Sequence, residues 1–304
     1  MPGWKALRFA VLGGIGLLAS SCSSYDARYK LVLAPDTKMA LDADTVDAVL
    51  EQISETSDRP IVLFVHGRGN EPEKSIARNA LAAIEARHDV RVIMFNWDSF
   101  CLTCRPVAHA ADAAPDLAYL LGAIAESRRD GAAGSNKLIL LTHSMGSIVL
   151  QHAVADSRFD QLPDDMFDAI VLASSDSDAD GHAGWLERLS RLAPATYVTV
   201  NPRDWILGLS GRDKRLGNRV PNGERAGPPV RYIVAESEDL TLHRLFNNGN
   251  LAGCGNLSRI VDAAIRGYAV LLDGEKSVGG NSIANVERTA ENVFAVKCSS
   301  AMGS

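Results

Sequence analysis

Ser144 lies where a buried strand would run directly into a helix, a place at which a serine hydroxyl can act as a nucleophile. The chain reads Leu-Ile-Leu-Leu-Thr-His-Ser-Met-Gly-Ser over 138–147, and its apolar start is typical of a buried strand. A sharp strand-to-helix turn would lift the serine to the carboxyl edge of a sheet. The N–H of Met145 would then begin the helix, where it can stabilise an oxyanion. Gly146 permits close backbone approach, whereas Thr142 replaces the glycine usual in such turns.

A second loop favours this interpretation over the simpler one, in which Ser144 only caps a helix. The apolar run at 61–65 predicts another buried strand, which ends in His-Gly-Arg-Gly-Asn at 66–70. Together the two segments resemble the α/β-hydrolase superfamily, and most closely its uncharacterised bacterial lipase-like or esterase members with a His-Ser-Met-Gly elbow. Asn-Trp-Asp-Ser at 96–99 also resembles that group. The resemblance covers residues 59–272.

The resemblance implies a catalytic triad in the chain order serine, acid, histidine, working without a cofactor. It places the base at His243, after the last strand expected in the hydrolase domain. It places the acid at Asp204, whose carboxylate would accept a hydrogen bond from the Nδ1–H of His243. The second oxyanion donor would be the backbone N–H of Gly67 or Arg68, beside that of Met145.

The acidic loop at 176–187 offers two other roles. Asp176 or Asp178 is an alternative triad acid to Asp204. The loop also matches the calcium-binding spacing D-x-D-x-D-G, followed six residues later by glutamate. A strand rather than a helix precedes it, and Ala183 replaces the usual larger aliphatic residue. We therefore expect an acidic, solvated loop and no bound metal.

Four cysteines outside the N-terminal segment suggest disulfides, since even numbers in an exported protein are typical of them. They are Cys101, Cys104, Cys254 and Cys298. The simplest of the possible pairings is 101–104 with 254–298, and the sequence does not select among them. Cys101 and Cys104 also have thioredoxin-like spacing, but the Pro106 that follows is out of place for that motif, so we expect a structural role.

The elements that must position these residues alternate between strand and helix. Strands are expected at 61–65, 90–95, 138–141, 169–173, 196–200 and 230–234, and helices at 74–87, 107–129, 145–155, 183–192 and 258–272. This alternation predicts βαβ units around a parallel sheet. The sequence thus predicts an α/β fold, a single three-layer domain of α/β-hydrolase type whose mostly parallel sheet has helices on both faces.

The N-terminal residues predict export to the bacterial cell envelope. Lys5 and Arg8 precede an apolar run that is too short to span a bilayer, and small residues then lead to Cys22. This pattern resembles a lipoprotein processing site, which implies lipidation of Cys22 and anchoring at the periplasmic face of the outer membrane. We expect a signal peptide at 1–21, a linker with a leading strand at 22–58, the hydrolase domain at 59–272 and a polar C-terminal tail at 273–304.

Composition narrows the function further. The 304 residues include 31 basic and 37 acidic side chains, so the net charge of −6 argues against a nucleic-acid partner. A hydrophobic content of 46% is ordinary for a globular protein. The sequence predicts a serine hydrolase that cleaves an ester or related acyl bond of a small molecule or lipid through an acyl-enzyme. The alternative is a non-catalytic envelope lipoprotein that uses the same scaffold for binding.

Overall fold

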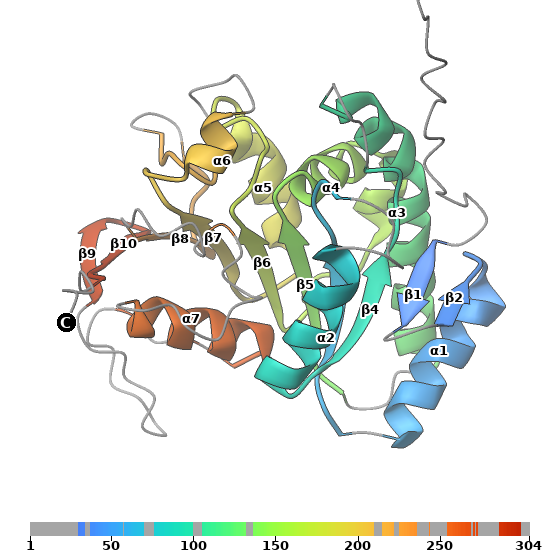
Figure 1. The fold of residues 1–304 in the computed structure, drawn as a ribbon. Helices are drawn as coiled ribbons and strands as arrows, with labels where there is room; N and C mark the ends of the chain where they lie inside the picture. The colour runs from blue at the N-terminus through green and yellow to red at the C-terminus, as the bar shows by residue number, and fades with distance from the viewer. Residues whose placement is uncertain are drawn as a thin grey trace, which may run out of the picture.

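A ten-stranded sheet forms the centre of the protein (Figure 1), in the order β2-β1-β4-β3-β5-β6-β7-β8-β10-β9. The structure is a computed structural model that describes residues 30–33, 37–56, 58–69, 76–99, 105–131, 136–209, 215–221, 225–235, 243, 254–268, 270, 272 and 286–298. The strands are β1 (Leu31–Leu33), β2 (Thr37–Met39), β3 (Ile61–Val65), β4 (Arg91–Phe95), β5 (Leu138–His143), β6 (Ala169–Ala173), β7 (Thr196–Val200), β8 (Val230–Val234), β9 (Val286–Ala290) and β10 (Val293–Val296). The helices are α1 (Ala43–Thr56), α2 (Ile76–His88), α3 (Val107–Arg129), α4 (Gly146–Val154), α5 (His182–Ser190), α6 (Trp205–Gly208), α7 (Gly255–Ile265) and the 3-10 helix η1 (Ser157–Gln161).

The middle of the sheet is parallel, as the alternation of strands and helices predicts. Strands β4, β3, β5, β6, β7, β8 and β10 run in the same direction, so their carboxyl ends meet at one edge. Antiparallel strands close the two sides, where β1 pairs with β4 and β2, and β9 pairs with β10. Loops after parallel strands therefore converge at the carboxyl edge, which is where ligands bind in open α/β sheets.

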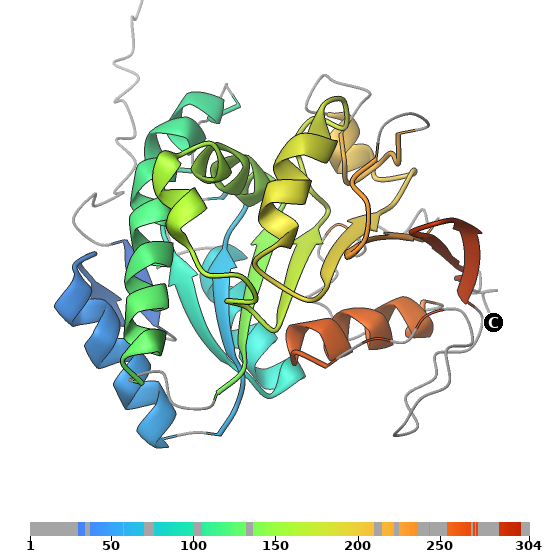
Figure 2. The ribbon, with the colours of Figure 1, turned by 180° about the vertical axis from the view of Figure 1, so that it is seen from behind.

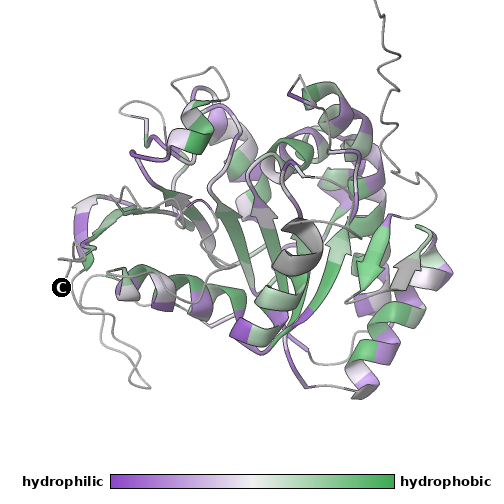
Figure 3. Ribbon diagram, in the orientation of Figure 1, coloured by the Kyte–Doolittle hydropathy of each residue, from purple (hydrophilic) through white to green (hydrophobic). Residues whose placement is uncertain are grey.

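Helices cover both faces of the sheet, which gives the predicted three layers. Ile61, Leu63 and Val65 of β3 pack in one core with α1, α3, α4 and α5, whereas Val62 and Phe64 pack in a second core with α2 and α7. The two views from opposite sides show these two helix layers in turn (Figures 1 and 2). The central strands are largely apolar, whereas β9 at one side of the sheet is mostly hydrophilic, and the helices carry hydrophilic residues on their outer sides (Figure 3).

Helix α1 occupies the segment 43–56, which the sequence predicts to be part of a linker. Its buried residues recur at helical spacing, at Val46, Val49, Leu50 and Ile53, and they join the same core as α3. Asp42 caps the helix, because its carboxylate accepts the N–H of Thr45 over 2.8 Å. The expectation of a linker with only a leading strand is thus corrected, and the periodic apolar residues were the available signal.

The C-terminal part of the chain also belongs to the sheet. The expected polar tail at 273–304 contains β9 and β10, and β10 pairs in parallel with β8. A disulfide between Cys254 and Cys298 joins the residue before α7 to the end of this region, which is one of the two bridges of the simplest pairing. Helix α7 begins earlier than the expected 258–272, and it also ends earlier because Gly267 turns the chain with a φ of 65°.

Several expectations fall outside the described residues. These include the signal peptide at 1–21, Cys22 and the pair Cys101 and Cys104. Among the residues that the structure does describe, helices with the length and apolar character needed to cross a bilayer were not found.

Candidate active site

The turn between β5 and α4 places Ser144 in a strained backbone conformation. Ser144 follows the last residue of β5 and has a φ of 49°. Non-glycine residues rarely adopt this left-handed region, and such strain costs about 1–3 kcal/mol. Gly146 makes the turn possible, because a Cβ there would lie 2.2 Å from the carbonyl oxygen of Val65 and 2.7 Å from that of His66. Thr142 is compatible with this turn: it pairs in regular register with β3 and β6, and its side chain is buried.

The loop after β6 holds this turn through backbone hydrogen bonds. The N–H of Ser144 donates to the carbonyl of Ala173 over 3.0 Å, and its carbonyl accepts the N–H of Asp176 over 3.1 Å. The same carbonyl accepts the N–H of Ser147 over 3.1 Å and its hydroxyl over 2.7 Å. Ser174, the first residue after β6, is left-handed as well, with a φ of 46°. Two neighbouring parallel strands therefore end in buried serines with positive φ.

The loop after β3 lies directly against Ser144. A Cβ at Gly67 would come within 2.9 Å of the Cβ of Ser144 and of two atoms of His143, so only glycine fits there. His66 anchors this loop: its ring stacks on Trp97 with centroids 5.8 Å apart and donates from Nδ1 to the Gly67 carbonyl over 2.8 Å. The indole N–H of Trp97 returns a hydrogen bond to the His66 carbonyl over 2.8 Å. These contacts fix the backbone of the loop beside the serine.

His66 is a neutral structural histidine. Burial lowers its pKa to about 4, and the hydrogen bond to the Gly67 carbonyl opposes this shift without cancelling it. At neutral pH the ring therefore carries no charge, and Nε2 is free to accept the backbone N–H of Trp97 at 3.4 Å. Arg68, two residues after His66, is exposed.

Asp204 and His243 form a buried pair at the same edge. The Nδ1 of His243 donates to Oδ2 of Asp204 over 2.8 Å, and both residues are at least nine-tenths buried. The other carboxylate oxygen accepts the N–H groups of Ile206 and Leu207 over 3.1 and 3.2 Å, which caps α6. Asp204 thus caps α6 with one carboxylate oxygen and accepts the hydrogen bond of His243 with the other.

His143 connects His243 to the serine turn, a role that the sequence does not predict. Its Nε2 donates to the backbone carbonyl of His243 over 2.8 Å, and the two rings meet edge to face at 5.0 Å. Because His143 directly precedes Ser144, this bond ties the backbone at His243 to the end of β5. A histidine in the sequence beside a proposed nucleophile was the only available signal.

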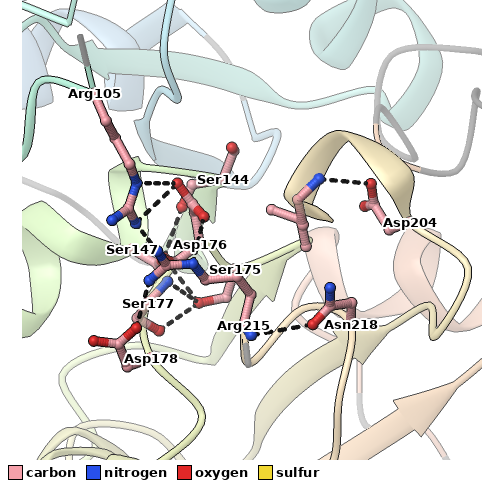
Figure 4. Close-up of polar contacts among 11 residues, drawn as sticks. Arg105, Ser144, Ser147, Ser175, Asp176, Ser177, Asp178, Asp204, Arg215 and Asn218 are labelled. Atoms are coloured by element: carbon pink, nitrogen blue, oxygen red, sulfur yellow. Dashed lines mark hydrogen bonds and ion pairs between the residues drawn. The ribbon is translucent and has the colours of Figure 1, made fainter. Parts of the chain in front are cut away.

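The carboxylates of the acidic loop contact arginines. Oδ2 of Asp176 accepts the Nε–H of Arg105 over 3.1 Å, and its Oδ1 lies 3.3 Å from Nε of Arg215 (Figure 4). Asp178 pairs with Arg215 over 2.5 Å. It is Asp204 that contacts His243, so the geometry favours Asp204 over the alternative acids Asp176 and Asp178.

The acidic residues of this loop have calcium-like spacing in the sequence, but their carboxylates do not come together around one point. The carboxylates of Asp176 and Asp178 flank the guanidinium of Arg215, and Asp180 lies 3.7 Å from Arg219. Among the described residues, no group of three or more histidine, cysteine or acidic side chains has the geometry of a metal site.

A match to a family model agrees with this architecture. Residues 42–234 match the model of a family described as alpha/beta hydrolases of unknown function (DUF900). Similar solved structures include carboxyl esterase 2 from the fungus Tuber melanosporum, with 12% identity, a TM-score of 0.40 and coverage of 68% of this chain and 78% of that one. The HSL-homolog EstE7 from a metagenome library is 13% identical, with a TM-score of 0.40 and coverage of 79% and 88%. A search of curated proteins found no match. Because the family match spans more than half of the sequence, the chain belongs to the alpha/beta hydrolases of unknown function.

Proposed function

We propose that the protein is a serine hydrolase that cleaves a carboxylic ester or related acyl bond of a small molecule or lipid. Ser144 is the nucleophile, His243 the general base and Asp204 the acid that orients the histidine. The turn at Ser144 serves as a nucleophile elbow of the lipase-like and esterase members of the superfamily.

The reaction proceeds through a covalent acyl-enzyme. Ser144 Oγ attacks the acyl carbon while its proton passes to Nε2 of His243, and the tetrahedral intermediate then expels the alcohol, which takes that proton. Water attacks the acyl-enzyme with His243 again as base, and the acid is released as the serine hydroxyl reforms. Asp204 accepts the Nδ1–H throughout and stabilises the imidazolium, so ester and water become acid and alcohol.

The oxyanion is stabilised by backbone amides. The N–H of Met145 lies at the start of α4, where helix amides lack intrahelical acceptors. The N–H of Gly67 or Arg68 comes from the loop that packs on Ser144. Loss of one such donor typically costs about 3 kcal/mol, or roughly 10²-fold in rate.

One observation carries this proposal: the buried hydrogen bond of 2.8 Å between His243 and Asp204. The two residues come from different loops, and burying a carboxylate beside an imidazole is costly unless the pair is used or well compensated. The strained conformation of Ser144 at the same edge supports it, because strain of this kind concentrates at functional sites.

The test is covalent labelling combined with turnover. The protein is treated with a fluorophosphonate and assayed on p-nitrophenyl butyrate, and the adduct is located by mass spectrometry. We expect an adduct on Ser144, and we expect Ser144→Ala to lose both labelling and turnover while remaining folded. Ser190→Ala is the matched control, because that hydroxyl donates to the carbonyl of Glu187 in α5. Turnover by Ser144→Ala at the parent's rate would refute the assignment.

The second candidate function is a non-catalytic envelope lipoprotein that binds through this scaffold. Thr142, in the position where such turns usually have glycine, is the observation that favours it. An intact fold that gives no adduct at Ser144 and no turnover would support this candidate.

We also propose that Cys22 is lipidated and anchors the protein at the periplasmic face of the outer membrane. The support is the N-terminal sequence, which lies outside the described residues. Cys22→Ala should move the protein from the membrane fraction to the soluble fraction, and an unchanged distribution would refute the anchor.

A further inference from the structure

A largely buried polar cluster, of which only the side chain of Asp178 is about half-exposed, lies beside the Ser144 turn and takes no part in the proposed reaction (Figure 4). We call it the arginine–serine cluster; its members are Arg105, Ser147, Ser175, Asp176, Asp178 and Arg215. The guanidinium of Arg215 is 1% exposed and the carboxylate of Asp176 is 5% exposed, so both charges lie away from water. Figure 4 shows the hydroxyl of Ser144 pointing away from the cluster, whereas its backbone faces it.

A continuous set of contacts leads from Arg215 to the backbone of Ser144. Arg215 pairs with Oδ1 of Asp176 at 3.3 Å, and the N–H of Asp176 donates to the carbonyl of Ser144 over 3.1 Å. A second route runs through hydroxyl groups: Ser175 donates to Ser147 over 2.8 Å, and Ser147 donates to the same carbonyl over 2.7 Å. The left-handed conformation at Ser144 is thus fixed from its carbonyl side.

Arg105 holds the same aspartate from the opposite direction. Its Nε–H donates to Oδ2 of Asp176 over 3.1 Å, and its Nη2 donates to the backbone carbonyl of that residue over 2.8 Å. With Arg215 on Oδ1, the carboxylate of Asp176 is bound on both oxygens and cannot rotate. The residue that donates to the Ser144 carbonyl is therefore immobilised by two arginines from distant segments.

The segment that carries Arg215 also contacts the loop of the proposed acid. The N–H of Gly217 donates to the Ser175 carbonyl over 2.8 Å, and its carbonyl accepts the N–H of Asn201 over 2.8 Å. The carbonyl of Asn201 in turn accepts the N–H of Asp204 over 3.0 Å. A Cβ at Gly217 would lie 2.5 Å from backbone atoms of Ser174 and Ser175, so this passage requires glycine. One short stretch of chain thus connects the loop after β6, which packs against Ser144, with the loop that carries Asp204.

Net stability is a poor explanation for such a cluster. Desolvation offsets most of the attraction between buried opposite charges, and apolar replacements of whole pairs are often neutral or stabilising. Fixed geometry is what a buried, multiply bonded arginine provides, since its planar guanidinium contacts two carboxylates in defined directions.

We propose that Arg215 is a positioning residue for the nucleophile: by holding Asp176 and Asp178, it keeps the loop after β6 against the Ser144 turn and in register with the Asp204 loop. This rests on the proposed function of Ser144. Arg215 contacts neither substrate nor reacting atoms, so its loss changes the placement of the hydroxyl and leaves substrate affinity almost unaltered.

The experiment removes the arginine without leaving an unpaired buried charge. In Arg215→Met/Asp178→Asn, the remaining pair of Arg105 and Asp176 is neutral overall. We expect kcat on p-nitrophenyl butyrate to fall by at least about 10-fold, because small misplacements of a reacting group are costly, while KM stays within about threefold. The rate of fluorophosphonate labelling of Ser144 should fall by the same factor as kcat. Arg215→Lys, which can reach one carboxylate, should recover part of the loss.

Arg191→Met is the matched control. Arg191 also binds a carboxylate and two backbone carbonyls, those of Asp164, Phe159 and Leu162, but at the opposite edge of the sheet. We expect it to lower the thermal midpoint without changing kcat or the labelling rate. If the double variant does not fold, Arg215→Lys replaces it, with an expected loss of kcat of about 3- to 10-fold at unchanged KM.

The outcomes separate this inference from the proposed function. A folded double variant, or a folded Arg215→Lys in its place, that keeps the parent's kcat and labelling rate would overturn the positioning role while Ser144 remains the nucleophile. A loss of kcat no greater than that of Arg191→Met at matched stability would overturn it as well. Failure of the proposed function would instead appear in the parent protein, as the absence of any adduct on Ser144.

Discussion

Apart from glycines, the two edges of the sheet place positive φ angles on different kinds of residue in the described part of the chain. At the amino edge, the left-handed residues are Asp89 before β4 and Asp165 before β6, with φ values of 52° and 51°, and both are exposed. Aspartate tolerates this conformation in turns. At the carboxyl edge, the left-handed residues are Ser144 and Ser174, and both are buried.

The burial of charged side chains also differs between the two edges. At the amino edge, Arg191 binds backbone carbonyls and the largely exposed carboxylate of Asp164. At the carboxyl edge, Arg215 is enclosed and pairs with Asp176, which is also buried. The comparison teaches that strain and buried charge gather where the proposed reaction takes place, as expected when a fold gives up local stability to organise a site.

The largest expected effect comes from Asp204→Asn at the carboxyl edge. We expect kcat to fall about 10⁴-fold, because a neutral amide neither fixes the histidine tautomer nor stabilises the imidazolium. The side-chain oxygen of asparagine still caps α6, so the thermal midpoint should change little. Steady-state assays and thermal melting measure both quantities. Parent-like turnover in Asp204→Asn, with a dead Asp176→Asn, would move the acid to the loop after β6.

The second prediction concerns pH and the buried ring of His66. Its pKa of about 4 lies below the ordinary 6.5, so the unfolded chain takes up the proton first as pH falls. The contribution of His66 is complete above about pH 6.5, and it shrinks by about 2–3 kcal/mol as the pH is lowered to about 4.5. Urea unfolding at several pH values should show this loss in the parent and a smaller one in His66→Gln. Identical pH dependence in the two proteins would contradict the role of burial.

The third prediction compares two glycines at helix positions. Gly146→Ala should lower the free energy of unfolding by about 1–3 kcal/mol and reduce turnover, because the new methyl group meets the carbonyls at the end of β3. Gly184→Ala in α5 meets no atom within 4 Å, so we expect it to stabilise by up to about 1 kcal/mol. Urea unfolding and p-nitrophenyl butyrate assays measure both. Equal effects of the two substitutions would show that the approach at Gly146 is not tight.

The smallest effect is expected at the amino edge. Asp165→Gly removes the strain of an aspartate in the left-handed conformation. It should raise the free energy of unfolding by up to about 1 kcal/mol and leave kcat unchanged. The backbone bond from residue 165 to the Arg191 carbonyl, 3.0 Å long, is retained. Denaturant unfolding and turnover measure the outcome, and a fall in kcat would show that the two edges are not functionally distinct.

The fold was largely predictable because buried parallel strands are continuous apolar runs. The strands at 61–65, 169–173, 196–200 and 230–234 have the expected bounds. Helix α1 escaped prediction although its apolar residues have helical spacing, since the polar residues around them dominate the segment. Strands β9 and β10 were missed because the longest continuous apolar run in that region has only four residues, 293–296.

The site was predictable only in part. The resemblance to the α/β-hydrolase superfamily implied Asp204 and His243, and the structure contains the hydrogen bond expected between them. Their catalytic roles remain predictions. Arg215 could not be found, because it lies in an irregular Gly/Arg/Pro-rich segment and its ion pairs join residues 37 or more positions apart. Such long-range polar contacts leave no periodic trace in a sequence.

The disulfide between Cys254 and Cys298 has a practical consequence for making the protein. It closes a loop with a sequence separation of 44 residues, and a link of that span contributes about 4 kcal/mol in the chain-entropy model. A reducing cytosol keeps cysteines as thiols. Material expressed in such a host would lack this bond, and β9 and β10 would stay on the sheet through pairing and packing alone. Samples for assays should therefore be produced by secretion or oxidised before purification.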